Sequence, residues 1–182
     1  MSRIAKKPIA IPSNVKIELL DDENLHISSD SRELNLPVPQ NILIDNSVDN
    51  LIYASFKSKP SSKTRGILGT FVRCLSSSIK GVTTGHLIVL KIVGIGFKCE
   101  ILDDLLFLNI GLSHMVAIQK PNYVNISIPE AGVLHLTSIN LQKLSEFASY
   151  IKSIKKVEPY KGKGIFCSSD NIIRKEVKSG KK

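Results

Sequence analysis

The sequence predicts an α+β fold made of two tandem copies of one unit, each a small, mostly antiparallel sheet with one helix packed on it. Short apolar stretches of period two are followed, in each half of the chain, by one longer stretch of helical period. The order also recurs, because Leu20-Asp21-Asp22 matches Leu102-Asp103-Asp104. The offset that carries Asp21 onto Asp103 also carries Ile42 onto Val124 and Leu51 onto Val133.

These patterns divide the chain into four parts. We expect a basic N-terminal arm at 1–8, a first repeat at 9–82, a second repeat at 83–156, and a basic C-terminal tail at 157–182.

The first repeat begins as a meander of short strands. Residues 15–19 alternate apolar and polar side chains, as a half-buried strand does, and an acidic turn at 21–24 leads into a second strand at 25–27. Further strands are expected at 34–36, 42–44 and 51–53.

A change of period then predicts a helix in each repeat. In the first, apolar residues fall at spacings of three and four, and Gly81 follows the last of them as the expected C-cap: Ile67, Leu68, Phe71, Val72, Leu75 and Ile79. In the second, a helix starting near Asn140 carries Leu141, Leu144, Phe147, Ala148, Ile151 and Ile154. We interpret both apolar stripes as core.

Charge is unevenly distributed along the chain. The net charge is +9, yet residues 9–56 hold two basic and eight acidic residues, whereas residues 57–80 hold six basic residues and no acid. Residues 152–182 hold ten basic and three acidic residues. Such segregation fits a protein that turns part of its surface towards a polyanion. No apolar run approaches the length of a membrane span, roughly 18 residues or more, so no membrane partner is expected.

The residue types that bind metals or form disulfides are scattered. Three cysteines, an odd number, are separated by long gaps and are expected to be free thiols: Cys74, Cys99 and Cys167. Four histidines show no ligand spacing. We therefore expect no metal and no cofactor. The N-terminus has no apolar region typical of a secretory signal.

Three motifs are candidates for catalysis, and each is incomplete. Residues 91–98 hold Gly94 and Gly96 in a strand-like run but lack the third glycine of a dinucleotide fingerprint. Ser113 and His114 are adjacent, and neighbours on a strand point to opposite faces, so a serine-hydrolase pair is disfavoured. Residues 162–164 lack the flanking elements of a P-loop. We expect no enzyme, with an enzyme using Ser113 or the glycine-containing run as the least favoured class.

The stretch from Glu158 to Ile165 is the strongest candidate binding site. It places Lys161 and Lys163 beside two glycines and Tyr160, with no acid after Glu158 until Asp170. Lysine ammonium groups suit phosphates, glycine permits close backbone approach, and a tyrosine ring can stack on a base. An exposed turn with solvated lysines is the alternative interpretation, because short basic motifs occur by chance.

The same stretch, Glu-Pro-Tyr-Lys-Gly-Lys-Gly-Ile, resembles the C-terminal signature of the sixth protein of the large ribosomal subunit, bacterial type. The opening Met-Ser-Arg-Ile-Ala-Lys-Lys-Pro-Ile is similar to the start of that family. Residues 91–98 are similar to its Val-Gly-Val-Gly-Tyr-Lys strand, and residues 110–114 to its Leu-Gly-Tyr-Ser-His segment.

The resemblance implies a structural protein of the large subunit, with two copies of a small α+β fold. It implies binding to large-subunit rRNA in the sarcin–ricin stem region, with stalk-base proteins as neighbours and translational GTPases transiently nearby. The second half is closer to mitochondrial members, and a plastid ribosome is the alternative location. A free-standing RNA-binding module outside the ribosome is the alternative function. The RNA-binding residues expected are Tyr160, Lys161, Gly162, Lys163, Gly164, Lys155, Lys156, Ser113, His114, Arg174 and Lys175.

Overall fold

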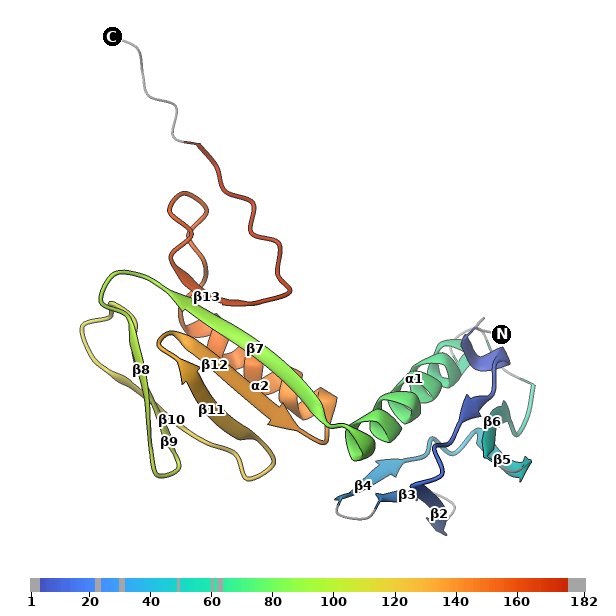
Figure 1. Ribbon diagram of the computed structural model, residues 1–182. Helices are drawn as coiled ribbons and strands as arrows, with labels where there is room; N and C mark the ends of the chain where they lie inside the picture. The colour runs from blue at the N-terminus through green and yellow to red at the C-terminus, as the bar shows by residue number, and fades with distance from the viewer. Residues whose placement is uncertain are drawn as a thin grey trace. The chain divides into compact units, whose positions relative to one another are not determined.

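The chain folds into two compact units, each with its own hydrophobic core (Figure 1). The computed structural model describes residues 4–21, 24–29, 32–48, 50–59, 61 and 64–176. Unit 1 comprises Met1–Gly85 with Ile139–Leu141, and unit 2 comprises His86–Ser138 with Gln142–Lys182. Within the described residues, neither helix is long and apolar enough to cross a membrane.

Unit 1 contains two three-stranded antiparallel sheets. One has the order β1-β6-β5 and the other is the meander β2-β3-β4, so the expected succession of short strands is present. A short 3-10 helix, η1, precedes them at Ile4–Lys6. The strands are β1 (Ile9–Ala10), β2 (Val15–Asp21), β3 (Asn24–Ser29), β4 (Arg32–Pro37), β5 (Ile42–Val48) and β6 (Leu51–Phe56). Residues 22 and 23 of the expected acidic turn lie outside the described residues.

Helix α1 (Thr64–Thr83) covers the strands of unit 1, and its apolar stripe forms much of the core. Leu68 and Leu75 are fully buried, as the helical period predicts, but Ile67 is 43% exposed and lies off the buried face. The expected C-cap at Gly81 was wrong, because the helix continues to Thr83 with Gly81 inside it. Gly85, with a φ of 77°, takes the left-handed conformation after the helix.

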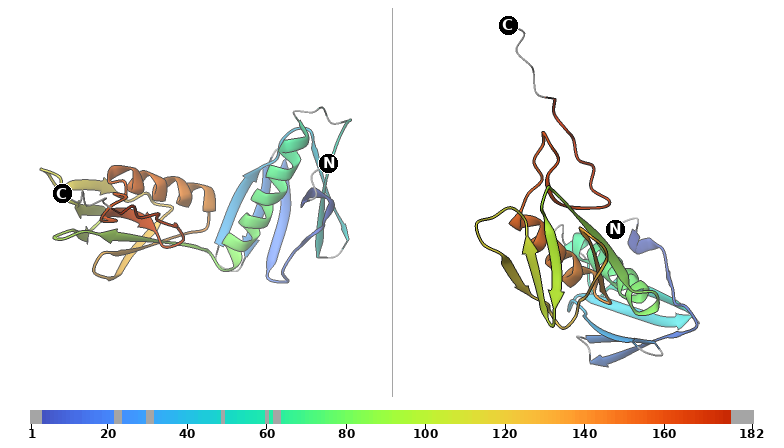
Figure 2. Two further views of the ribbon diagram at one scale, coloured as in Figure 1. Left: turned by 90° about the horizontal axis from the view of Figure 1, so that it is seen from above. Right: turned by 60° about the vertical axis from the view of Figure 1, so that its left-hand side comes forward.

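Unit 2 contains a four-stranded sheet of order β11-β12-β7-β13 and the meander β10-β9-β8. Its strands are β7 (His86–Val93), β8 (Lys98–Leu102), β9 (Leu105–Asn109), β10 (Val116–Gln119), β11 (Asn125–Glu130), β12 (Val133–Ser138) and β13 (Gly164–Cys167). Helix α2 (Leu141–Ile154) lies along the strands (Figure 2) and buries Leu144, Phe147, Ala148 and Ile151. Leu141, expected on that face, is 38% exposed.

The two units repeat one topology down to individual irregularities. The hairpin β5–β6 has a register shift between Asp45 and Val48, and the hairpin β11–β12 has one between Ser127 and Glu130. The spacing from Asp45 to Ser127 equals the spacing from Asp21 to Asp103 in the sequence repeat. The turns that close the two hairpins also match. Asn50 (φ 62°) corresponds to Gly132 (φ 80°). The predicted α+β fold with two tandem copies is therefore confirmed.

Two expectations about local structure need correction. Gly94 and Gly96 do not lie within a strand, because β7 ends at Val93 and a turn follows, with the Phe97 N–H donating to the Gly94 carbonyl at 3.3 Å. The tail expected from residue 157 is not simply an arm, because Gly164–Cys167 add a fourth strand to the sheet of unit 2.

No disulfide joins Cys74, Cys99 and Cys167, all of which lie in the described part of the chain. Burial raises the pKa of the Cys99 thiol, with Glu100 adding to the rise, and a hydrogen bond with the backbone of Gly132 opposes it. A thiol held protonated is a poor nucleophile at neutral pH.

Candidate RNA-binding site

The basic stretch singled out in the sequence forms a closed loop between α2 and β13. The Glu158 N–H donates to the Lys163 carbonyl at 2.8 Å, and the Gly162 N–H donates to the Glu158 carbonyl at 3.0 Å. At the base of the loop, the Ile165 N–H donates to the Lys155 carbonyl at 3.0 Å. The loop therefore has a defined conformation, held by its own backbone, before any ligand binds.

Gly164 lets the two ends of this loop pack closely. Its φ is 140°, and a Cβ added there would lie 2.8 Å from both the carbonyl oxygen of Lys156 and the Cα of Val157. Real Cβ atoms do not approach backbone so closely, so only glycine fits. The close approach that Gly164 permits is thus an approach to the protein itself, and its contact with RNA stays a prediction.

Gly162 has a related role towards the C-terminal segment. Its φ is 69°, and a Cβ added there would lie 3.0 Å from Nε of Arg174. The guanidinium group therefore lies directly against the loop. The Lys175 N–H also donates to the Pro159 carbonyl at 2.9 Å. Residues 174 and 175 are in this way held beside the loop, Arg174 by its guanidinium group and Lys175 by its backbone.

The side chains of the loop are turned outward to different degrees. Tyr160 is 51% exposed, Lys161 is exposed and Lys163 is half-buried. Of the flanking cations, Lys156, Arg174 and Lys175 are exposed, whereas Lys155 is half-buried. The loop and its flanking residues therefore expose an aromatic ring and several cations, residue types suited to a phosphate backbone with an adjacent base.

An ion pair anchors the segment that leads away from β13. Asp170 accepts a hydrogen bond from Lys152 of α2 and a second, at 3.0 Å, from the Cys167 N–H. The Lys152 ammonium group, and next the Cys167 N–H, hold the pKa of Asp170 below its ordinary value. Asp170 is therefore charged at neutral pH, and its charge is directed to α2 rather than to the loop.

Ser113 and His114 lie apart from the loop in sequence but at the same end of β7. They are exposed in bends between β9 and β10, so the expectation that they lie on a strand was wrong. A side chain at Gly94 would collide with the Phe97 ring, and a Cβ at Gly111 would come within 2.9 Å of it. Phe97 therefore packs between the end of β7 and the segment that carries Ser113 and His114.

Sequence reasoning missed two residues at this end of unit 2. Phe97 is the ring that connects the two segments, and Ile95 is 90% exposed between Gly94 and Gly96. An isoleucine placed between two glycines is the signal that could have indicated a protruding turn.

Comparison of the sequence with known proteins identifies the family to which the chain is related. A family model described as "Ribosomal protein L6" matches residues 93–166, from the end of β7 to β13. The chain is 33% identical over 181 residues to "Large ribosomal subunit protein uL6" of Limosilactobacillus reuteri, covering 100% of both chains. It is 34% identical over 182 residues to the protein of the same name from Geotalea uraniireducens, again covering 100% of both. It is also 33% identical to "Large ribosomal subunit protein uL6c" of Phaeodactylum tricornutum over 100% of both. The chain therefore belongs to the ribosomal protein L6 family.

Proposed function

We propose that the protein is a structural constituent of the large ribosomal subunit that binds large-subunit rRNA. The observation that carries the proposal is the closed loop 158–163, on which Arg174 and Lys175 are held by contacts with Gly162 and Pro159. A preformed loop loses little conformational freedom on binding, so its cations contribute to affinity without a large ordering cost. No catalytic step is assigned to it.

Within the subunit, we propose that the protein lies in the sarcin–ricin stem region near the stalk base, where translational GTPases dock. Family membership supports this position. Cross-linking of purified subunits tests it, and cross-links from residues 155–175 to the sarcin–ricin stem and to stalk-base proteins are expected. Cross-links only to distant rRNA segments would contradict the placement.

The ribosome in question is proposed to be organellar, mitochondrial in the first instance and plastid as the alternative. A uL6c relative and bacterial relatives of similar identity are compatible with either organelle. Fractionation of organelles followed by sedimentation distinguishes these locations. Co-sedimentation with the mitochondrial large subunit is expected. A peak with plastid subunits would select the alternative, and RNA association without a ribosomal peak would favour the free-standing module.

The binding site is tested with purified protein and a large-subunit rRNA transcript over a salt series. The Lys161→Ala/Lys163→Ala variant should lower the slope of log K against log salt by roughly 0.7–0.9 for each phosphate interaction that it removes. The matched control is Lys16→Ala/Lys57→Ala, which removes two exposed lysines of unit 1. Equal slopes for wild type and the loop variant would show that the loop is only a solvated turn.

A further inference from the structure

Unit 2 shows what covers the edge beside the first strand of the repeat. There β13 pairs with β7, Phe166 lying opposite Lys91, and the Ser168 N–H donates to the Val89 carbonyl at 2.9 Å. In unit 1 the equivalent strand is β1. The Ile11 N–H donates to the Asn50 carbonyl at 2.8 Å, just as the Ile92 N–H donates to the Gly132 carbonyl at 2.7 Å. By this match Ala10 corresponds to Lys91.

Two prolines prevent a strand from pairing with β1 in the same way. Backbone groups alternate sides along a strand, so those of Ile9 and Ile11 face β6. The backbone groups of Pro8, Ala10 and Pro12 face the opposite side, which in unit 2 is the side occupied by β13. Proline has no N–H to donate. The Pro12 carbonyl already accepts from the Val15 N–H at 3.0 Å. Only Ala10 retains both a donor and an acceptor at this edge, which is too few for an added strand.

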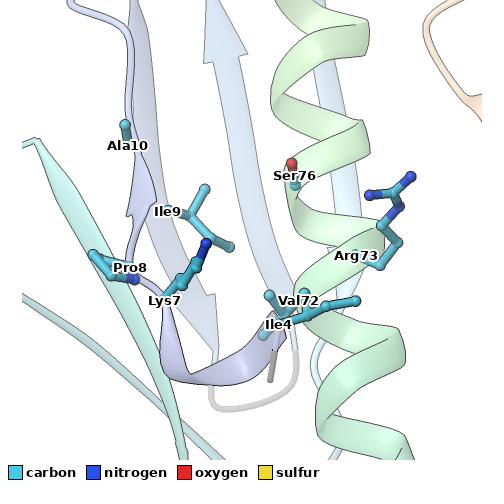
Figure 3. A pocket seen from close by; sticks show the side chains of 8 residues that line it. All are labelled: Ile4, Lys7, Pro8, Ile9, Ala10, Val72, Arg73 and Ser76. Atoms are coloured by element: carbon cyan, nitrogen blue, oxygen red, sulfur yellow. The ribbon is translucent and has the colours of Figure 1, made fainter. Parts of the chain in front are cut away.

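A groove of about 430 Å³ lies at this edge, between the N-terminal arm and α1 (Figure 3). Ile9 extends between the arm and the helix, with the Lys7 ammonium group beside it on the arm and Ser76 on the helix. Arg73 extends outward from α1. The groove is lined by Ile4, Lys7, Pro8, Ile9, Ala10, Val72, Arg73 and Ser76.

The surroundings of this groove are cationic. None of its lining residues is acidic, and the 20 residues of α1 contain Arg65, Arg73 and Lys80 but no aspartate or glutamate. Neither Lys7 nor Arg73 has a carboxylate partner among the residues that the structure describes. In unit 2, by contrast, Lys152 of α2 is neutralised by Asp170. Unpaired cations beside an apolar floor favour an anionic ligand with a sugar or base attached.

We propose that this groove of unit 1 is a second RNA-backbone site, in which Lys7 and Arg73 bind phosphate and Ser76 donates a hydrogen bond. The site rests on the proposed binding of large-subunit rRNA. An acidic protein segment has matching charge, but the two prolines remove the strand pairing by which extended peptides commonly bind a sheet edge. RNA is therefore the favoured occupant.

The test uses the full-length protein and a large-subunit rRNA transcript over a salt series. Lys7→Ala/Arg73→Ala should lower the slope of log K against log salt by about 1.4–1.8, which is two phosphate contacts at roughly 0.7–0.9 each. The control Lys16→Ala/Arg65→Ala removes the same two residue types from β2 and α1 outside the groove, and should change the slope less. Lys7→Arg/Arg73→Lys should retain the wild-type slope.

Each other result has a definite meaning. If Lys161→Ala/Lys163→Ala lowers the slope and the groove variant does not, the second site is overturned while the proposed function stands. If the control lowers the slope as much as the groove variant, the effect is one of net charge and the site is also overturned. Binding of polyglutamate that disappears in the groove variant, with an unchanged RNA slope, would assign the groove to an acidic protein. A wild type that does not bind the transcript would overturn both proposals.

Discussion

Units 1 and 2 have separate cores built in the same way, and they differ at one edge of the sheet. Both place a meander of three strands, a hairpin with the same register shift, and one helix in the same order. In unit 1 the first strand, β1, is two residues long and is flanked by Pro8 and Pro12. In unit 2 the first strand, β7, is eight residues long and pairs with β13. The comparison teaches that packing of the repeat depends on the strands that both units have, whereas the edge beside the first strand carries an added strand in unit 2 and none in the described part of unit 1.

Substitutions at equivalent positions of the two cores give the largest expected effects. Ile52 and Leu134 occupy equivalent positions of β6 and β12, with exposures of 1% and 0%. Ile52→Ala and Leu134→Ala should each lower the free energy of unfolding by about 2–5 kcal/mol, because each leaves a cavity. Denaturant unfolding monitored separately in each unit measures this. A cost under about 1 kcal/mol at either position would end the equivalence of the two cores.

Gly164 tests the pairing of β13 with β7, which has no counterpart in the described part of unit 1. Gly164→Ala should destabilise by about 1–3 kcal/mol, because it places a Cβ against the backbone of Lys156 and Val157 at a positive φ. Gly66→Ala is the matched control, since it meets nothing within 4 Å on α1 and should stabilise by roughly 0.5–1 kcal/mol. Thermal unfolding gives both values. Effects of the same sign would refute the assigned role of Gly164.

Tyr160 tests whether the closed loop 158–163 binds RNA through stacking of a base. Tyr160→Ala should weaken binding to the rRNA transcript by about 1–3 kcal/mol if a base stacks on the ring. Tyr53→Ala on β6 of unit 1 removes a ring that is 40% exposed and should leave affinity unchanged. Filter binding at constant salt measures both. A loss of equal size at Tyr53 would mean that the aromatic contribution is not confined to unit 2.

The smallest effect concerns the ion pair between α2 and the segment after β13. Asp170→Asn should lower stability at neutral pH by under about 1 kcal/mol, because the pair with Lys152 is partly exposed. The folded-state pKa of Asp170 is lowered, so the wild-type advantage is present above the ordinary value of about 3.9 and is lost as pH falls through the folded pKa. Unfolding curves of wild type and variant, recorded from neutral to acid pH, measure how this difference in stability changes with pH. An advantage that persists in strong acid would show another origin.

The fold was predictable because its signals are local and repeated. Residues 15–19 alternate as a strand does, and Leu68 and Leu75 recur at the helical period. The prediction at Gly81 was wrong because a glycine after an apolar stripe is typical of a C-cap. In the structure Gly81 is buried and the helix extends to Thr83, so tertiary packing outweighs the low helix propensity of glycine. Propensity was overridden by packing at that one place.

The candidate site was predictable in residue type but not in geometry. The lysines and Tyr160 were evident from the sequence, but the run Gly164–Cys167 is too short to reveal a strand. The placement of Arg174 on Gly162 joins residues on opposite sides of β13 with no periodicity between them. Contacts of that kind follow from the folded backbone and leave no pattern in the sequence.

The pairing of β13 with β7 has a consequence for the time at which the loop forms. Gly164 lies opposite Val93, so everything from β8 to α2 must be synthesised before the two partners can meet. Chains emerge and fold from the N-terminus, and contacts distant in sequence form slowly. A nascent chain can therefore assemble the core of unit 1 and most of the core of unit 2, which Ile165 of β13 completes, while the loop 158–163 is still open. The closed conformation of the loop is reached only after β13 has been made, so the proposed binding of rRNA at this loop follows synthesis of the strands and helix that precede it.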